Sequence, residues 1–176
     1  MIFIPTSLAG AFIVEPEPLR DERGFFARTW DQRELEARGL NSKIVQCSVS
    51  FSERRGTLRG MHYQTPPHEE AKLVRCVRGA LHDVIIDLRS DSATFRRHFS
   101  TVLRAGDYRA LYVPEGVAHG FLTLEDGTEA LYQISEAHRP EAARGVRWDD
   151  PAFGIRWPEA VRVISEPDRS YPDYAR

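Results

Sequence analysis

The chain has 176 residues, enough to bury a sizeable core in one domain without disulfide or metal support. Its 24 basic and 26 acidic side chains give a net charge of -2, so no global field draws it to nucleic acid or to an anionic membrane. No stretch approaches the roughly 20 apolar residues of a membrane span, and the N-terminus lacks the pattern of a secretion leader. We therefore predict one cytoplasmic domain over residues 1–176, with no nucleic-acid or membrane partner.

The first element predicted along the chain is a helix that starts after Asp31. Asp31 and Glu34 form a capping box, Leu35 and Ala37 continue the helix, and Gly39 ends it. Farther along, short runs rich in Val, Leu, Ile, Phe and Tyr are separated by turn residues, as in a β-sandwich or barrel. These predicted strands are residues 73–77, 81–88, 98–103, 109–113, 120–124 and 129–134.

Two further features refine this picture. Cys47 and Cys76 both lie in apolar, strand-like runs, so we predict two buried, reduced thiols and no disulfide. The tail after Trp157 is rich in proline, with Pro158, Pro167 and Pro172. Because proline interrupts regular structure, the tail is expected to wrap the barrel as irregular chain and not to form a second domain.

A histidine motif in the middle of the chain resembles half of a metal site. In metal-binding cupin barrels, a Gly, five intervening residues, a His and a second His two positions later place ligands along one strand. Gly56 and His62 keep this spacing, but Gln64 replaces the second His, and Lys72 shares the place of the expected carboxylate. His62 and His119 alone fall short of the three or four ligands of a stable site. We predict a cupin cavity that binds no metal and uses its histidines for proton transfer.

Several segments together resemble the dTDP-4-dehydrorhamnose 3,5-epimerase family nearly from end to end. The resemblance implies a double-stranded β-helix (jelly roll) of the cupin type, all-β with one or a few short helices. It also implies a homodimer that acts on a nucleotide-linked 4-keto-6-deoxyhexose with no cofactor, neither metal nor nicotinamide. The matching pieces are residues 21–26, 58–64, 72–76, 83–89 and 113–121, followed by Arg144, Gly145, Trp148, Ser165 and Asp168.

The chemistry of a keto sugar explains these residue types. A ketone at C4 acidifies the hydrogens on C3 and C5, and inversion needs a base, an acid on the opposite face and a donor for the enolate oxygen. His62 suits the base because an imidazole is largely neutral at cytoplasmic pH and a carboxylate can orient it. The resemblance assigns that carboxylate to Asp168, with Asp83 as a second candidate. It places Tyr132 as the proton donor, and Lys72 would hold the enolate oxygen.

The remaining candidate residues are expected to bind the substrate. His119 would hydrogen-bond the enolate oxygen or a sugar hydroxyl. Arg59 and Arg23 would clamp the diphosphate, because guanidinium groups match phosphate oxygens in pairs. Gln46 keeps an amide that can pair with a base edge, and Phe26 or Trp30 would supply a surface on which the base stacks.

The nucleotide end departs from the family pattern. Arg28 stands where family members commonly carry a Glu, Ser48 replaces an Asn, His138 replaces a stacking Tyr, and Pro167 replaces a Lys. The catalytic set is complete while the nucleotide-binding set differs, so the carrier could be dTDP, as expected from the family, or CDP or GDP. Inversion at C3, C5 or both stays open.

Other functions compete with epimerisation. A sugar 3,4-ketoisomerase would share the fold and both histidines but would not require Lys72, Tyr132 and Asp168 together. A metal-dependent cupin would need another ligand beside His62 and His119. A non-catalytic sugar-nucleotide binding module would need no acid opposite a base. We predict the isomerase.

Overall fold

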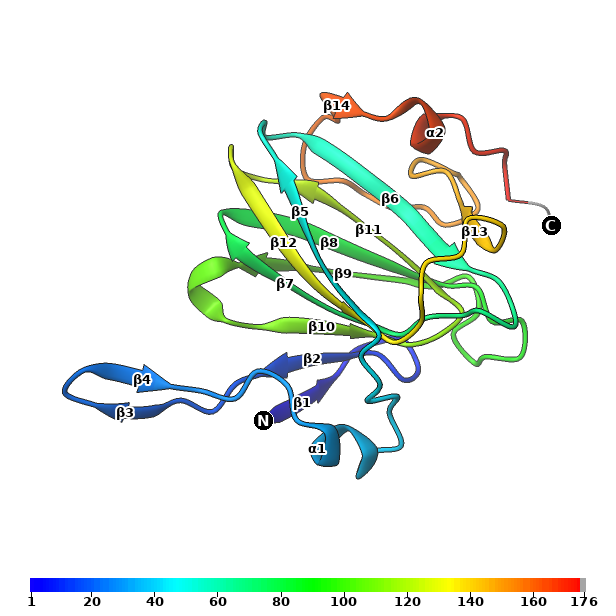
Figure 1. The fold of residues 1–176 in the computed structure, drawn as a ribbon. Helices are drawn as coiled ribbons and strands as arrows, with labels where there is room; N and C mark the ends of the chain where they lie inside the picture. Colours follow the sequence, from blue (N-terminus) through cyan, green and yellow to red (C-terminus); the bar gives the residue numbers. More distant parts are fainter. Residues whose placement is uncertain (175–176) are drawn as a thin grey trace.

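Two antiparallel sheets face each other in the computed structural model, which describes residues 1–174 (Figure 1). In spatial order, the first sheet consists of β1 (Ile2–Pro5), β2 (Phe12–Glu15), β10 (Ala110–Val113), β7 (Lys72–Arg78), β12 (Thr128–Ile134) and β5 (Gln46–Ser52). The second sheet consists of β13 (Ala143–Gly145), β6 (Thr57–Gln64), β11 (Val117–Thr123), β8 (Ala80–Asp87) and β9 (His98–Arg104), and β14 (Val163–Ile164) pairs with β6.

The apolar residues of the predicted strands build the core between these sheets. All six predicted runs correspond to strands, from β7 to β12, with ends that differ by up to three residues. Alternation along each strand sends every second side chain inward. The resulting structure confirms the predicted all-β jelly roll. Its largest buried cluster includes Leu8, Ile13, Val74, Leu81, Ile85, Leu111 and Phe121.

Two short helices and a hairpin lie outside the sheets. Helix α1 (Gln32–Glu36) begins at Asp31, whose side chain accepts a hydrogen bond from the Glu34 amide, so the predicted N-cap is confirmed. Helix α2 (Glu166–Arg169) lies near the C-terminus, and a 3-10 turn (Ala105–Asp107) follows β9. No helix within residues 1–174 is both long and apolar enough to cross a bilayer. The hairpin of β3 (Leu19–Asp21) and β4 (Gly24–Phe26) extends away from the barrel (Figure 1).

Two expectations from the sequence are wrong. Cys76 is buried, but Cys47 is exposed, because β5 lies at the edge of its sheet and turns Cys47 outward. The tail also contains regular structure. Val163 and Ile164 pair in parallel with β6, and Ser165 caps α2 by accepting a hydrogen bond from the Asp168 amide. Ser165 is therefore a helix N-cap followed by proline in the first turn, which is a recognised start signal.

A bulge in β6 decides which side chains of this strand face the cavity between the sheets. His62 pairs with His119 of β11, and Arg59 pairs with Phe121, so two residues of β6 lie opposite Gly120 alone. In a regular strand, Arg59 and His62 would point to opposite faces. The extra residue reverses the alternation and brings both side chains to the cavity side.

The bulge depends on close contact between two glycines. A Cβ atom on Gly120 would lie 2.6 Å from the sulfur of Met61, 2.7 Å from the carbonyl oxygen of Arg59 and 2.8 Å from Cα of Gly60. No side chain fits at position 120 without moving the bulged backbone. Gly120 therefore maintains the position of both Arg59 and His62.

We predict that Gly120→Ala lowers the melting temperature by about 5 °C, since overpacking a filled site costs about 2 kcal/mol. Differential scanning calorimetry measures the change. Gly106→Ala is the matched control, because a Cβ atom there meets nothing within 4 Å. Equal melting temperatures for the two variants would show that the bulge adapts to a side chain.

Candidate active site

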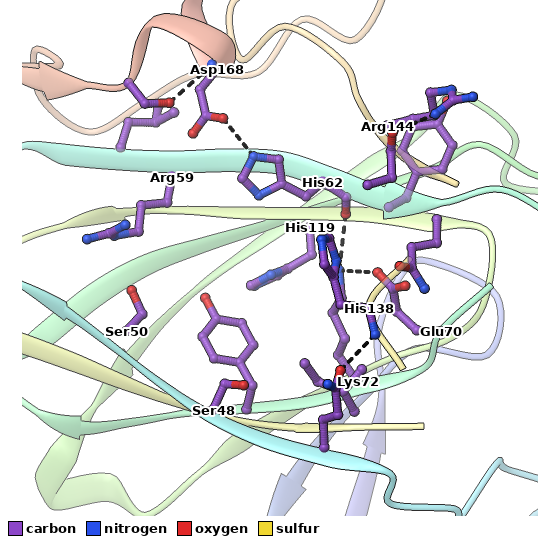
Figure 2. Close-up of a pocket in the computed structure, with 18 of the residues that line it drawn as sticks. Ser48, Ser50, Arg59, His62, Glu70, Lys72, His119, His138, Arg144 and Asp168 are labelled. Atoms are coloured by element: carbon purple, nitrogen blue, oxygen red, sulfur yellow. Dashed lines mark hydrogen bonds and ion pairs between the residues drawn. The ribbon is translucent and has the colours of Figure 1, made fainter. Parts of the chain in front are cut away.

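A cavity of about 760 Å³ opens between the two sheets. Most of the side chains that the sequence singled out line it, although they come from distant strands and from α2 (Figure 2). The predicted residues found here are Gln46, Ser48, Arg59, His62, Lys72, His119, Tyr132, His138 and Asp168. A cavity of this size accommodates a ligand as large as a sugar nucleotide.

His62 forms a close pair with Asp168 at one wall of the cavity. The distance between Nε2 of His62 and Oδ1 of Asp168 is 2.7 Å, and Figure 2 shows Asp168 descending from α2 toward the imidazole. The second oxygen, Oδ2, accepts a hydrogen bond of 3.1 Å from the amide of Gly60 in the bulge. One carboxylate therefore orients the histidine and satisfies the backbone that the bulge removes from the strand ladder.

The environment of Asp168 keeps its carboxyl ionised. Burial by itself would raise the pKa of Asp168, but the hydrogen bonds from His62 and from the Gly60 amide outweigh burial, and the pKa is lowered. The His62 side chain is 45% exposed, whereas that of Asp168 is 9% exposed. One edge of the imidazole therefore faces the cavity, and Nε2 on the other edge is held by the buried carboxylate of Asp168.

A second histidine and carboxylate lie deeper. Nε2 of His119 is 2.7 Å from Oδ1 of Asp83, and both side chains are buried. Asp83, the second candidate for the partner of His62, therefore lies beside His119 instead. The ring of Tyr132 packs edge-on against His119, with 5.8 Å between ring centroids. Burial, and then the charge of Asp83, raises the pKa of Tyr132, so its hydroxyl keeps its proton at neutral pH.

Lys72 is held by two acceptors inside the cavity. Its Nζ atom lies 2.9 Å from Oε1 of Glu70 and 3.2 Å from the carbonyl oxygen of His62. An ammonium group has three N–H donors, so these contacts leave one donor for a ligand. The charge of Lys72 is buried together with that of Glu70, and the pairing makes this burial tolerable.

Gln64 does not serve as a ligand in the cavity. Its Nε2 donates to the carbonyl oxygens of His68 and Ala137, and its Oε1 accepts from the amide of Arg139. The amide that replaces the second cupin histidine therefore holds two loops together. Within residues 1–174, no three His, Cys, Asp or Glu side chains gather into a potential metal site.

The opposite end of the cavity is lined by β5 and the loop after β12. Ser48 and Ser50 line the cavity, while Val49 and Phe51 of the same strand are exposed on the outside. Gln46 anchors the loop, because its Oε1 accepts a hydrogen bond of 2.8 Å from the amide of His138. The carboxamide nitrogen of Gln46 is then available to an incoming base.

Arg59 is positioned for an anion at this wall. Its guanidinium donates to the carbonyl oxygen of Phe51 at 2.9 Å and to the hydroxyl of Ser52 at 3.2 Å. These contacts hold the side chain across the strands without neutralising its charge. A phosphate group would find a pre-positioned guanidinium here.

Three predicted substrate-binding residues lie outside the cavity of their own chain. Arg23 and Phe26 belong to the β3–β4 hairpin, and Phe26 is 70% exposed. Arg23 pairs with Asp21, and Arg28 lies 3.4 Å from Asp31. Within one chain, these three residues therefore do not lie with the nine predicted residues that line the cavity.

The sequence reading missed several residues that line the cavity. They are Ser50, Tyr63, Glu70, Glu136, Arg144 and Tyr171. Ser50 could have been found, because Gln46, Ser48 and Ser50 alternate with apolar residues along a strand. Tyr171 carries no local signal, since only the folded tail brings it to the cavity, whereas Arg144 belongs to a piece that matches the family but was given no role.

Comparisons with known proteins agree with this architecture. Residues 5–176 match the family model described as dTDP-4-dehydrorhamnose 3,5-epimerase. An enzyme of that name from Methanothermobacter thermautotrophicus is 44% identical over 96% of this chain and 92% of its own. The crystal structure of the epimerase from Elizabethkingia anophelis superposes with a TM-score of 0.95 at 36% identity, covering 99% of this chain and 96% of that one. The structure of the Bacillus anthracis enzyme, crystallised with TDP and PPi, superposes with a TM-score of 0.93 at 38% identity. The match covers 98% of this chain and 99% of that one. The chain therefore belongs to the dTDP-4-dehydrorhamnose 3,5-epimerase family.

Proposed function

We propose that this protein inverts C3 and C5 of a dTDP-linked 4-keto-6-deoxyhexose by proton transfer through an enolate, without a metal ion. The observation that carries the proposal is the placement of His62 and Tyr132 on facing sheets of one cavity, with Lys72 beside them. Membership of the family, and the TDP bound to the Bacillus anthracis relative, support thymidine diphosphate as the carrier.

The first step is removal of a proton from the carbon beside the ketone. His62 takes this proton, and the electron pair of the broken C–H bond moves onto the C4 oxygen. Asp168 holds the imidazole in place and stabilises the imidazolium that forms, as a buried carboxylate does for a catalytic histidine. The free N–H of Lys72 donates to the developing oxyanion, a contribution of about 3 kcal/mol for one donor in a dry site.

The second step returns a proton from the opposite face. Tyr132 lies on the sheet that faces His62, and its raised pKa keeps the hydroxyl protonated until an enolate is present. A phenol is a weak acid, but an enolate is a strong enough base to take its proton. Exchange with solvent then restores both residues, so each inverted carbon carries a hydrogen from water.

We also propose a cytoplasmic homodimer in which the hairpin of one subunit completes the cavity of the other. Exposed apolar side chains on the hairpin and on the outer face of β5 support an interface, among them Phe26, Val49 and Phe51. Arg23 and Arg28 would reach the neighbouring cavity with this hairpin. Cys47 and Cys76 are unpaired thiols, in keeping with a reducing compartment.

We predict that His62→Ala lowers deuterium incorporation from D₂O into the keto sugar by a factor of about 10² to 10⁴, the usual contribution of a general base. Tyr132→Phe should retain exchange but lose inversion, because His62 can return deuterium only to the original face. Proton NMR of the product measures both quantities at C3 and C5. Undiminished inversion in both variants would refute these roles.

The choice of substrate is tested in the same assay. The wild-type enzyme is offered dTDP-, CDP- and GDP-linked 4-keto-6-deoxyhexoses, and we expect the dTDP sugar to exchange at both carbons. Exchange at a single carbon would identify a mono-epimerase. A new ketone at C3 would identify a ketoisomerase. No exchange with any of the three sugars would overturn the proposed function.

We predict that Asp168→Asn lowers kcat by about 10² to 10⁴, because the uncharged amide no longer stabilises the imidazolium that forms on His62. The lowered pKa of Asp168 means that it is ionised across the whole working range. The measurement is kcat at neutral pH for Asp168→Asn and the wild type, and a kcat within about twofold of the wild type would contradict the pairing.

The dimer is tested by complementation. We predict that Arg23→Ala lowers kcat/KM by about tenfold or more, the effect of losing a phosphate contact of about 1.5–3 kcal/mol. If Arg23 acts in the neighbouring cavity, a hybrid of Arg23→Ala and His62→Ala subunits contains one intact site. After subunits exchange at random, the mixture should regain about a quarter of wild-type activity. Activity no higher than the average of the two parents would place Arg23 outside the partner's site.

A further inference from the structure

The segment that carries Asp168 has few means of holding its own shape. This C-terminal strap, residues 163–174, begins as β14, which pairs with β6 only through Val163 and Ile164. Helix α2 has four residues, and a single isolated helical turn is unstable in water. Contacts with the barrel must therefore fix the position of Asp168.

Tyr171 makes one of these contacts, against a glycine of β13. A Cβ atom placed on Gly145 would lie 2.2 Å from Cε2 and Cζ of Tyr171 and 2.7 Å from its hydroxyl oxygen. The aromatic ring therefore lies directly on the backbone of Gly145, in a notch that any side chain at position 145 would fill. Gly145 has no positive φ that would itself require glycine.

The notch adjoins the catalytic histidine. Gly145 of β13 pairs with His62 of β6, so the ring of Tyr171 lies on the residue next to His62 in the sheet. The rings of Tyr171 and His62 are also in edge contact, with 6.4 Å between centroids. Tyr171 follows Asp168 by three residues and lines the same cavity. It thus contacts the neighbour of His62 while belonging to the strap that carries the partner of His62.

We propose that Tyr171 is a positioning residue for the proposed epimerisation: its ring, docked in the notch at Gly145, holds α2 against β6 so that Asp168 keeps its bonds to His62 and to the Gly60 amide. Beyond Tyr171, the strap is joined to the barrel by the amide of Tyr174, which donates to Asp150 at 2.6 Å. That bond fixes the far end of the strap, and Tyr171 fixes the part nearest to Asp168. This inference rests on the proposed function for its kinetic consequence but not for its structural one.

The test is a double-mutant cycle on Tyr171 and Gly145. We expect Tyr171→Ala and Gly145→Ala each to lower kcat by about tenfold or more, because a displacement of about 1 Å at a catalytic group has effects of this order. Tyr171→Phe keeps the ring and should stay within about twofold of the wild type. The three atoms nearest to a methyl group at position 145 all belong to the ring of Tyr171, so once the ring is gone the double variant should lose no more than Tyr171→Ala alone.

Two further readouts separate positioning from general destabilisation. The Kd for dTDP should stay within about twofold of the wild type in every variant, since Gln46 and Ser48, which are assigned to the base, lie on β5 of the sheet that faces β6 and the strap. The NMR chemical shift of the His62 Cε1–H signal at neutral pH should change in Tyr171→Ala and Gly145→Ala, as in Asp168→Asn, because the contact with Asp168 is displaced, and it should stay close to the wild-type value in Tyr171→Phe. Gly106→Ala, with nothing within 4 Å of its Cβ position, controls for the glycine substitution.

The outcomes are distinct. Additive losses in the double variant, or an unchanged His62 signal in Tyr171→Ala, would overturn the positioning role. The NMR measurement needs no substrate, so it tests this inference even if the wild-type enzyme fails to exchange any keto sugar. That failure would overturn only the proposed function.

Discussion

The carboxylate of Asp168 is the constraint on which the rest of the site depends. One oxygen faces the imidazole of His62, and the other accepts the amide of Gly60, which the bulge in β6 has removed from the strand ladder. An unpaired buried amide would destabilise the bulge, and an unpaired histidine would turn freely. The Asp168 side chain, near the C-terminal end of the chain, pairs with both the amide and the histidine. The local fold and the chemistry are thus stabilised by the same group.

The bulge also explains how a cationic and a basic residue come to act on one ligand. Arg59 and His62 are three positions apart, a spacing that separates side chains on a regular strand but unites them across an inserted residue. The facing sheet contributes Lys72 and Tyr132. Charges of both signs therefore surround the cavity, and three of its carboxylates each lie beside a histidine or a lysine: Asp168 beside His62, Glu70 beside Lys72, and Asp83 beside His119.

Local pattern predicted six strands of the core, and most of the residues assigned to the site, several of them through the family resemblance, do line the cavity. Strand runs such as residues 129–134 alternate visibly, and His62 and Lys72 lie in recognisable motifs. The bulge was not predicted, since it arises only when β6 meets Gly120 of β11. The strap was read as irregular chain because its proline content hid the Ser165 cap. Cys47 was expected inside because apolar neighbours suggest burial, and only the edge position of β5 reverses this.

Strand β5 has its polarity inverted relative to an ordinary sandwich strand. Ser48 and Ser50 face the interior, while Val49 and Phe51 face outward. Shifting this strand by one residue would bury its apolar side chains and close the cavity, because a slip of one position exchanges the two faces. Thermostability and ligand capacity therefore oppose each other along β5. Selection for a more heat-resistant variant would tend to replace the serines of this wall with apolar side chains. Such changes would stabilise the fold and reduce the cavity volume available to the substrate.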